Sequence, residues 1–407
     1  MLDLQDRLDE LMQLGHYRRM RMVSGPQGPR VLLDGRPVLL LCSDNCLGLA
    51  DHPRVREASA EATLRWGAGA GGPRIVAGNM TLHRRLEERL ADFVGTQAAL
   101  LVGSGYLTAV GVIPALVRPG EIVFADEGNH PALADGCRLS GAEVVAYGHA
   151  DVEHLAWALR NADGRAALIV TSAVFPLDGD VAPLEDIVAL AARHDVRVMV
   201  DEAHALGALG TGGRGAVAAA GLEGHVDVVS GTLGTALGAY GGYVCCDAVM
   251  AHHLVNEARP VAASSGLPPA VAAAALAALE LLEEQPRRVQ RLADNAEELR
   301  DELALEGFDV AGARTHIVSL PIGDARATAR LADAALEAGV FVEAVRPPAA
   351  FDGAARVRLA AMATHTRSEL RAAARVIGRA ALRVGARPAV EERGPFDHAA
   401  VELPRAA

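Results

Sequence analysis

The 407-residue chain contains no lysine, because all 39 of its basic residues are arginine. No side-chain primary amine is therefore available, and a mechanism that needs a lysine Schiff base cannot operate with this chain's own residues. Arginine does not replace lysine in that chemistry, since its guanidinium group stays protonated. The absence excludes one class of covalent catalysis.

Long apolar runs are missing as well. No segment approaches the roughly 20 apolar residues that a membrane-spanning helix needs. Residues 1–21 form an amphipathic, mixed-charge pattern without the apolar centre of a secretory signal. We therefore expect a cytoplasmic protein.

Cysteine and net positive charge are also scarce. The five cysteines form no CxxC or Cys/His cluster, and several lie in strand-like apolar runs, so we expect reduced core residues and no metal site. The net charge of −12 argues against a nucleic-acid partner. What remains is a chain with 51% hydrophobic residues, which is typical of a globular protein with a large core.

From residue 98 onward, apolar strands alternate with helical segments such as 183–194. This alternation is typical of a mostly parallel sheet covered on both faces. Strands are predicted at 98–102, 121–124, 166–170, 196–200 and 226–229. Ligands of such sheets bind beyond the carboxyl ends of the strands, where polar clusters stand in this chain. We therefore predict one site built from these clusters: Ser104 to Tyr106, Asp126 to His130, Asp178 to Asp180, Asp201 to His204 and Ser230 to Thr232.

The flanking segments complete the predicted organisation. Residues 16–50 alternate polar and apolar positions around Asp34-Gly35, which predicts a hairpin. Strands predicted at 316–321, 340–344 and 355–359, with helices between them, suit a small α/β domain. We predict an N-terminal arm (1–50), a large domain (51–290), a small C-terminal domain (291–385) and a mobile tail (386–407).

Nine motifs occur in the order and at the spacing of one known family. They are CLGLADHP, SGY, DEGNH, LDGDVAPL, DEAHALGALGTGGRG, SGTLGTALGAYGG, SSGLPPA, VRPPA and ARVRLAAMATHT. On these motifs, the chain between about residues 17 and 380 resembles the α-oxoamine synthases. These pyridoxal-phosphate (PLP) enzymes join an amino acid to an acyl thioester. The resemblance implies the α/β fold of fold-type I PLP transferases, which is aspartate-aminotransferase-like, with a large mostly parallel-sheet domain and a smaller C-terminal α/β domain.

The resemblance also implies a PLP site. In the family, Asp201 matches the carboxylate that pairs with the pyridine nitrogen, His204 the partner of the ring hydroxyl, and His130 the imidazole stacked on the ring. The residues that match the phosphate-binding positions are Ser104, Gly105, Tyr106, Thr232 and Ser265. Of these, Ser265 matches a residue that reaches the phosphate from the other subunit, which implies a homodimer.

Substrate contacts follow from the same resemblance. Arg356 matches the arginine that binds the substrate carboxylate, a contact that suits the two-pronged guanidinium group. Asp44 stands where the family has an asparagine that touches the substrate amino acid. A carboxylate at that place repels a substrate carboxylate.

Further departures concern the chemistry itself. Thr235 stands at the position of the Schiff-base lysine, and a neutral hydroxyl neither forms the imine nor moves a proton as an amine does. Other family positions are also changed: Ala132 replaces a serine, Ser172 a glutamate, Pro176 a serine, and Ala349-Ala350-Phe351 a Thr-Val-Pro. Several substrate-facing changes beside the lost lysine indicate a changed reaction.

Three hypotheses follow. The first is an acyltransferase that takes a CoA-bound or carrier-protein-bound acyl thioester without lysine–PLP chemistry, with His130 or His204 as general base and Asp201 and Thr235 in the same site. The second is a non-catalytic subunit that pairs, as a heterodimer, with a lysine-bearing homologue. The third is an enzyme that uses PLP or pyridoxamine phosphate noncovalently; the first hypothesis also allows a protein without cofactor.

Overall fold

The structure is a computed structural model that describes residues 3–347, 349–350 and 352–386. The chain forms two compact units. The larger comprises 44–176 and 180–289, and the smaller is built from the described residues of 1–43, 177–179 and 290–386. The domain division predicted from the sequence stays a prediction. Residues 387–407 of the predicted tail, and Phe351, lie outside the described residues.

A seven-stranded sheet forms the centre of the larger unit, in the order β4-β10-β9-β8-β7-β5-β6. Its strands are β4 (Ala98–Val102), β5 (Ile122–Asp126), β6 (Glu143–Tyr147), β7 (Ala166–Ser172), β8 (Arg197–Asp201), β9 (Val228–Thr232) and β10 (Gly242–Cys246). Neighbouring strands from β9 to β6 pair in parallel, and β10 is antiparallel to both of its neighbours. The predicted mostly parallel α/β fold is confirmed.

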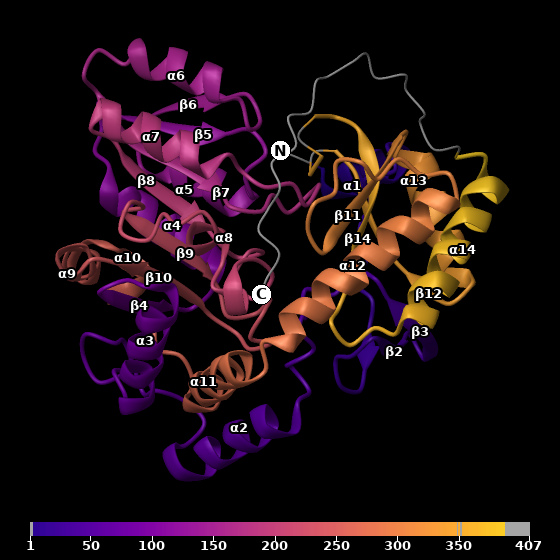
Figure 1. Cartoon of the computed structure of the whole chain (residues 1–407), viewed down its shortest axis with the longest axis horizontal. Helices are drawn as coiled ribbons and strands as arrows, with labels where there is room; N and C mark the ends of the chain where they lie inside the picture. Colours follow the sequence, from indigo (N-terminus) through magenta and orange to yellow (C-terminus); the bar gives the residue numbers. More distant parts are fainter. Residues whose placement is uncertain (1–2, 348, 351, 387–407) are drawn as a thin grey trace. The chain divides into compact units, whose positions relative to one another are not determined.

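The inner strands of this sheet are rich in apolar residues because helices cover them. All five residues of β5 are buried, as expected for a strand that is packed on both faces. Figure 1 shows α3 beside β4 and α6 beside β6 at the two ends of the sheet. The helices of this unit are α2 (Pro53–Trp66), α3 (Thr81–Val94), α4 (Gly105–Leu116), α5 (Pro131–Leu139), α6 (Val152–Arg160), α7 (Leu184–His194), α8 (Ala216–Ala219), α9 (Ala248–Glu257), α10 (Arg259–Ala263) and α11 (Pro269–Glu284), with a 3-10 turn, η1 (Thr211–Gly213).

The smaller unit holds two further sheets, one in the order β1-β2-β3-β12 and one in the order β11-β14-β13. Their strands are β1 (Val23–Ser24), β2 (Arg30–Leu33), β3 (Arg36–Leu40), β11 (Ile317–Gly323), β12 (Val340–Phe341), β13 (Glu343–Val345) and β14 (Ala355–Ala360). Its helices are α1 (Leu4–Gln13), most of α12 (Arg287–Leu305), α13 (Ala325–Glu337) and α14 (Arg367–Val384). Among the described residues, none of the protein's helices has the length and apolar character to cross a bilayer.

Two predictions for the smaller unit have different outcomes. The hairpin at Asp34-Gly35 is confirmed: Leu33 pairs with Arg36, and both turn residues have positive φ (50° and 80°). The single strand predicted at 340–344 is wrong, because this segment divides into β12 and β13, which belong to different sheets. β12 pairs with β3 and β13 with β14, so the chain changes partner at residue 342.

Candidate active site

One edge of the large sheet gathers most of the predicted site residues. Asp126, Ser172, Asp201 and Thr232 are the last residues of β5, β7, β8 and β9. These strands are parallel, so their carboxyl ends face the same way. Backbone pairing also places Asp201 opposite both Ser172 and Ser230. The residues of the predicted site therefore stand on neighbouring, hydrogen-bonded strands.

The start of α4 forms one end of the site. Ser104 caps this helix with its hydroxyl oxygen, which accepts a hydrogen bond from the Leu107 amide at 3.1 Å. Gly105 lies against β9, where a Cβ would be 3.2 Å from the Thr232 Cβ. The Thr232 hydroxyl accepts from the Gly234 amide and donates to the Gly241 carbonyl. A capped helix N-terminus beside a hydroxyl is a suitable place for a phosphate group.

Tyr106 contributes to this end through its backbone position in the first turn of α4. Its ring is 48% exposed, and its hydroxyl donates to Asp135 at 2.8 Å. The side chain is thus engaged with α5, which agrees with a role for the backbone amide only.

Asp201 lies at the middle of the edge. Burial raises the pKa of Asp201 to about 6, and the hydrogen bond from the Ala203 amide at 3.1 Å opposes that rise. Within the described residues, no arginine or histidine forms an ion pair with this carboxylate. A desolvated carboxylate of this kind is suited to a cationic N–H group of a ligand.

Two predicted histidines lie in the turns that follow β5 and β8. His130 caps α5, and its Nδ1 accepts a hydrogen bond from the Ala132 amide at 3.1 Å. This bond leaves Nε2 as the nitrogen that carries the proton of the neutral ring. His204 is half-buried in the turn that begins at Asp201.

Thr235 is only 3% exposed and lies in the loop between β9 and β10. Backbone hydrogen bonds close this loop, from Leu233 N to Gly241 O at 3.0 Å and from Ala239 N to Leu233 O at 2.9 Å. Ala236 packs against Gly207, where a Cβ on the glycine would be 2.4 Å from the Ala236 Cβ. Backbone hydrogen bonds and the Ala236–Gly207 contact therefore help to hold the loop in place.

The remaining predicted residues do not belong to the strands of the large sheet. Asp44 and Ser265 are exposed. Arg356 belongs to the smaller unit, where it is 4% exposed and donates to Asp178 at 2.5 and 2.6 Å and also to Asp352. Two carboxylates of its own chain thus already occupy the guanidinium group that was predicted to bind a substrate carboxylate.

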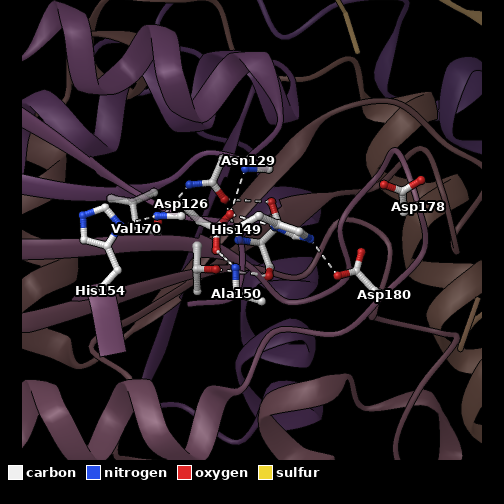
Figure 2. Close-up of polar contacts among 12 residues, drawn as sticks. Asp126, Asn129, His149, Ala150, His154, Val170, Asp178 and Asp180 are labelled. Carbon is white, nitrogen blue, oxygen red and sulfur yellow. Dashed lines mark hydrogen bonds and ion pairs between the residues drawn. The ribbon is translucent and has the colours of Figure 1, made fainter. Parts of the chain in front are cut away.

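One polar cluster near the site was missed from the sequence. His149 lies between Asp126 and Asp180, with a carboxylate oxygen at each ring nitrogen (Figure 2). Both aspartates were assigned to polar clusters, but the histidine was not singled out because its partners are 23 and 31 residues away. No local pattern could have found this contact.

Comparison with known proteins decides the family. The family model for aminotransferase class I and II matches residues 36–377. The chain belongs to this family. The 8-amino-7-oxononanoate synthase of Geobacter sulfurreducens is 45% identical over 381 residues, which cover 93% of this chain and 97% of the relative. The enzyme of the same name from Citrifermentans bemidjiense is 43% identical over 383 residues, with 93% and 98% covered.

The fold is also that of solved serine palmitoyltransferases. A lysine-to-alanine variant of the S. paucimobilis enzyme, with bound PLP–myriocin aldimine, matches with a TM-score of 0.89 at 32% identity and covers 94% of this chain and 97% of its own. The predicted α-oxoamine synthase family and the fold-type I PLP-transferase fold are confirmed. The family is one of PLP-dependent enzymes, so the prediction that leaned towards an enzyme is confirmed as well.

PLP is the cofactor of this family, and the residues of the site meet some of the requirements for binding it. The α4 N-terminus with Thr232 suits the phosphate, and Asp201, desolvated and without an ion-pair partner in the described chain, suits the protonated ring nitrogen. Thr235 does not fit covalent attachment, because a hydroxyl cannot form a Schiff base.

Proposed function

We propose that the chain is an acyltransferase of the α-oxoamine synthase type that takes an acyl thioester, on CoA or a carrier protein, without lysine–PLP Schiff-base chemistry. One observation supports the proposal: Thr235 is 3% exposed in the closed loop that follows β9, and the carboxyl ends of β8 and β9, with Asp201 and Thr232, lie at the same edge of the sheet. A site that had lost all use would have no reason to keep this arrangement. The relatives named 8-amino-7-oxononanoate synthase support transfer to an acceptor.

In this proposal His204, in the turn that follows β8, is the general base. The acceptor's N–H or O–H proton passes to His204, a C–N or C–O bond forms at the thioester carbonyl, and the C–S bond breaks as the thiolate takes up a proton. His130 Nδ1 accepts from the Ala132 amide, so the His130 Nε2–H is the group that donates a hydrogen bond to the carbonyl oxygen of the thioester.

The acceptor in this proposal is an amine or an alcohol without a free carboxylate. Arg356 is paired with Asp178 and Asp352, so its charge is compensated. Asp44 adds a further carboxylate at a position matched to the substrate in the family. Both features disfavour an amino-acid carboxylate.

PLP or pyridoxamine phosphate is proposed as a noncovalent ligand. The serine palmitoyltransferase variant holds PLP joined to myriocin although its lysine is alanine, which supports retention of the cofactor by a lysine-free site of this fold. When bound, PLP supplies an electron-withdrawing pyridinium ring. The residues proposed to hold it are Ser104, Gly105, Tyr106, Thr232, Asp201, His204, His130 and Ser265.

A homodimer is part of the proposal. The loop 67–80 pairs with the segment of Ser265 through the Pro73–Ser265 bridge and the Gly266 N to Gly72 O bond at 2.9 Å. This loop exposes Ile75 (58%) and Val76 (78%) next to one another, an apolar pair that a subunit interface would cover. The same surface favours a second candidate, a partner subunit for a lysine-bearing homologue.

Titration of the purified protein with PLP and with pyridoxamine phosphate tests the cofactor part. We expect saturable binding, and covalent attachment after borohydride reduction only in Thr235→Lys, where mass spectrometry finds the label at position 235. The natural chain carries no side-chain amine, so it is the negative control for covalent labelling of a lysine. If neither compound binds, the cofactor part is wrong.

Turnover of acyl-CoA tests the enzyme part. We expect release of free thiol in PLP-free or PLP-loaded protein, reduced at least 100-fold by His130→Ala, in line with the loss of a hydrogen-bond donor to the developing oxyanion. His252→Ala is the control, because His252 is exposed on α9 away from the predicted site. Failure to consume any thioester, together with stable binding to a lysine-bearing homologue, would favour the partner subunit instead.

A further inference from the structure

The histidine cluster that was missed from the sequence lies against the turn that carries His130. His149 follows β6 and extends between two elements of the larger unit. Its Nδ1 is 2.9 Å from Asp126 Oδ1, at the end of β5, and its Nε2 is 2.8 Å from Asp180 Oδ2, beyond β7. The ring also meets Phe175 edge to face, with 4.3 Å between centroids.

This geometry requires a charged ring. A neutral imidazole has one N–H and one lone pair, so it can donate to one carboxylate only. With a carboxylate at each nitrogen, both nitrogens must donate, and the ring is an imidazolium. The hydrogen bonds and charges of Asp126 and Asp180 raise the pKa of His149 to about 10, although burial acts in the opposite direction. Within the described residues, no set of His, Cys, Asp and Glu is arranged for a metal ion.

Asp126 connects the His149 ring to the turn that carries His130. Its side chain is fully buried and accepts from the Gly128 amide at 2.8 Å and from the Ala150 amide at 2.9 Å, in addition to His149. Gly128 lies directly on the ring, since a Cβ there would be 2.4 Å from His149 Nδ1. The turn of residues 126–130 is therefore packed against the imidazolium.

The next residue fixes the turn to the sheet. The Asn129 amide group donates to the Val170 carbonyl at 2.9 Å and accepts from the Ser172 amide at 2.8 Å (Figure 2 shows Asn129 beside Asp126). His130 follows at once as the cap of α5. On the other side, Phe175 N bonds to Asp180 O at 3.0 Å, so the carboxylate of Asp180 is presented by a closed hairpin.

We propose that His149 is a positioning residue for His130, acting as a cation clamped between Asp126 and Asp180. Without it, the buried Asp126 carboxylate would lose its counter-charge, and the turn would rearrange to reach water. The inference rests on the proposed function only in that His130 belongs to the site. The placement of the His130 ring can be measured without any substrate.

Proton NMR of protein labelled with ¹³C at histidine Cε1 tests this, with the His149 and His130 signals assigned from His149→Gln and His130→Gln. In the natural chain we expect His149 to remain protonated past pH 8 and to titrate near pH 10. In His149→Gln we expect the His130 signal to shift or broaden, while His252→Gln leaves it unchanged. A His149 midpoint near pH 6.5, or an unmoved His130 signal in folded His149→Gln, would overturn the proposal.

Asp180→Asn is the second variant, in case His149→Gln does not fold. It removes one carboxylate and keeps the Asp126 contact, so we expect the His149 midpoint to fall by at least one pH unit while the fold is retained. An unchanged midpoint would contradict the clamp. Because these signals need no turnover, loss of the clamp and absence of acyltransferase activity are separate results.

Discussion

Asp201 is a carboxylate whose surroundings disfavour its charge. Burial raises its pKa from 3.8 to about 6, so the stability that it contributes in its protonated form, complete below pH 3.8, is lost as the pH rises through 6. Asp201→Asn removes the charge and keeps an acceptor for Ala203. We expect this variant to be more stable at pH 7.5, by at most about 3 kcal/mol, and equal to the natural chain at pH 3.5.

Thermal melts at the two pH values check this, with Asp126→Asn as the matched control. Asp126 is also a buried aspartate at a strand end, but it is paired with His149, so its replacement should lower the melting temperature at pH 7.5. A lower melting temperature for both variants at pH 7.5 would mean that Asp201 has a partner that stabilises its charge. A rise for Asp201→Asn shows a residue kept for a ligand at a cost in stability.

At the scale of elements, the start of α4 should have two separable functions. Ser104→Ala removes the cap, which costs about 1 kcal/mol of stability, and weakens PLP binding because the helix N-terminus loses its fixed geometry. Asp151→Ala removes the equivalent cap of α6, where the aspartate accepts from the His154 amide at 2.8 Å. We expect similar losses in melting temperature and a loss of PLP affinity for Ser104→Ala only; equal affinity in both variants would contradict the phosphate role.

The elements also show which features the sequence could predict. β4 begins and ends where it was predicted, because AALLV is a continuous apolar run. β6 was not singled out, since four of its five residues are exposed or half-buried and its apolar pattern is weak. Segment 340–344 looked like one strand because VFVEA is mostly apolar and contains no turn residue, whereas its division depends on two different partner strands.

The residues of the site show the same difference between features that a local pattern predicts and contacts that depend on the fold. The residues that were predicted, such as Asp201 and His130, follow strands directly or match family motifs, so local pattern sufficed. The clamp at His149 and the pairing of Arg356 with Asp178 join residues that are far apart in the chain, at separations of 23 and 178. Contacts of this kind are created by the fold and leave no local trace.

At the scale of the whole molecule, we predict a dimer of two 42.3 kDa chains. Val76→Asp should shift it towards the monomer, because a charge would enter the apolar surface of loop 67–80, where Val76 is 78% exposed. Val249→Asp is the matched control: Val249 is 80% exposed on α9, away from this loop. Light scattering after gel filtration distinguishes the two variants, and a monomeric natural chain at micromolar concentration would contradict the prediction.

The closed loop between β9 and β10 has an evolutionary consequence. Thr232 pairs with Gly242 at its base, and Ala236 and Gly238 lie against Gly207 and Ala50, so the backbone around Thr235 is fixed by its neighbours. Two of the four threonine codons differ from a lysine codon by a single base. A loop closed by backbone bonds and neighbouring contacts favours folding with either residue at 235, so an amine can be lost or regained there in one mutational step.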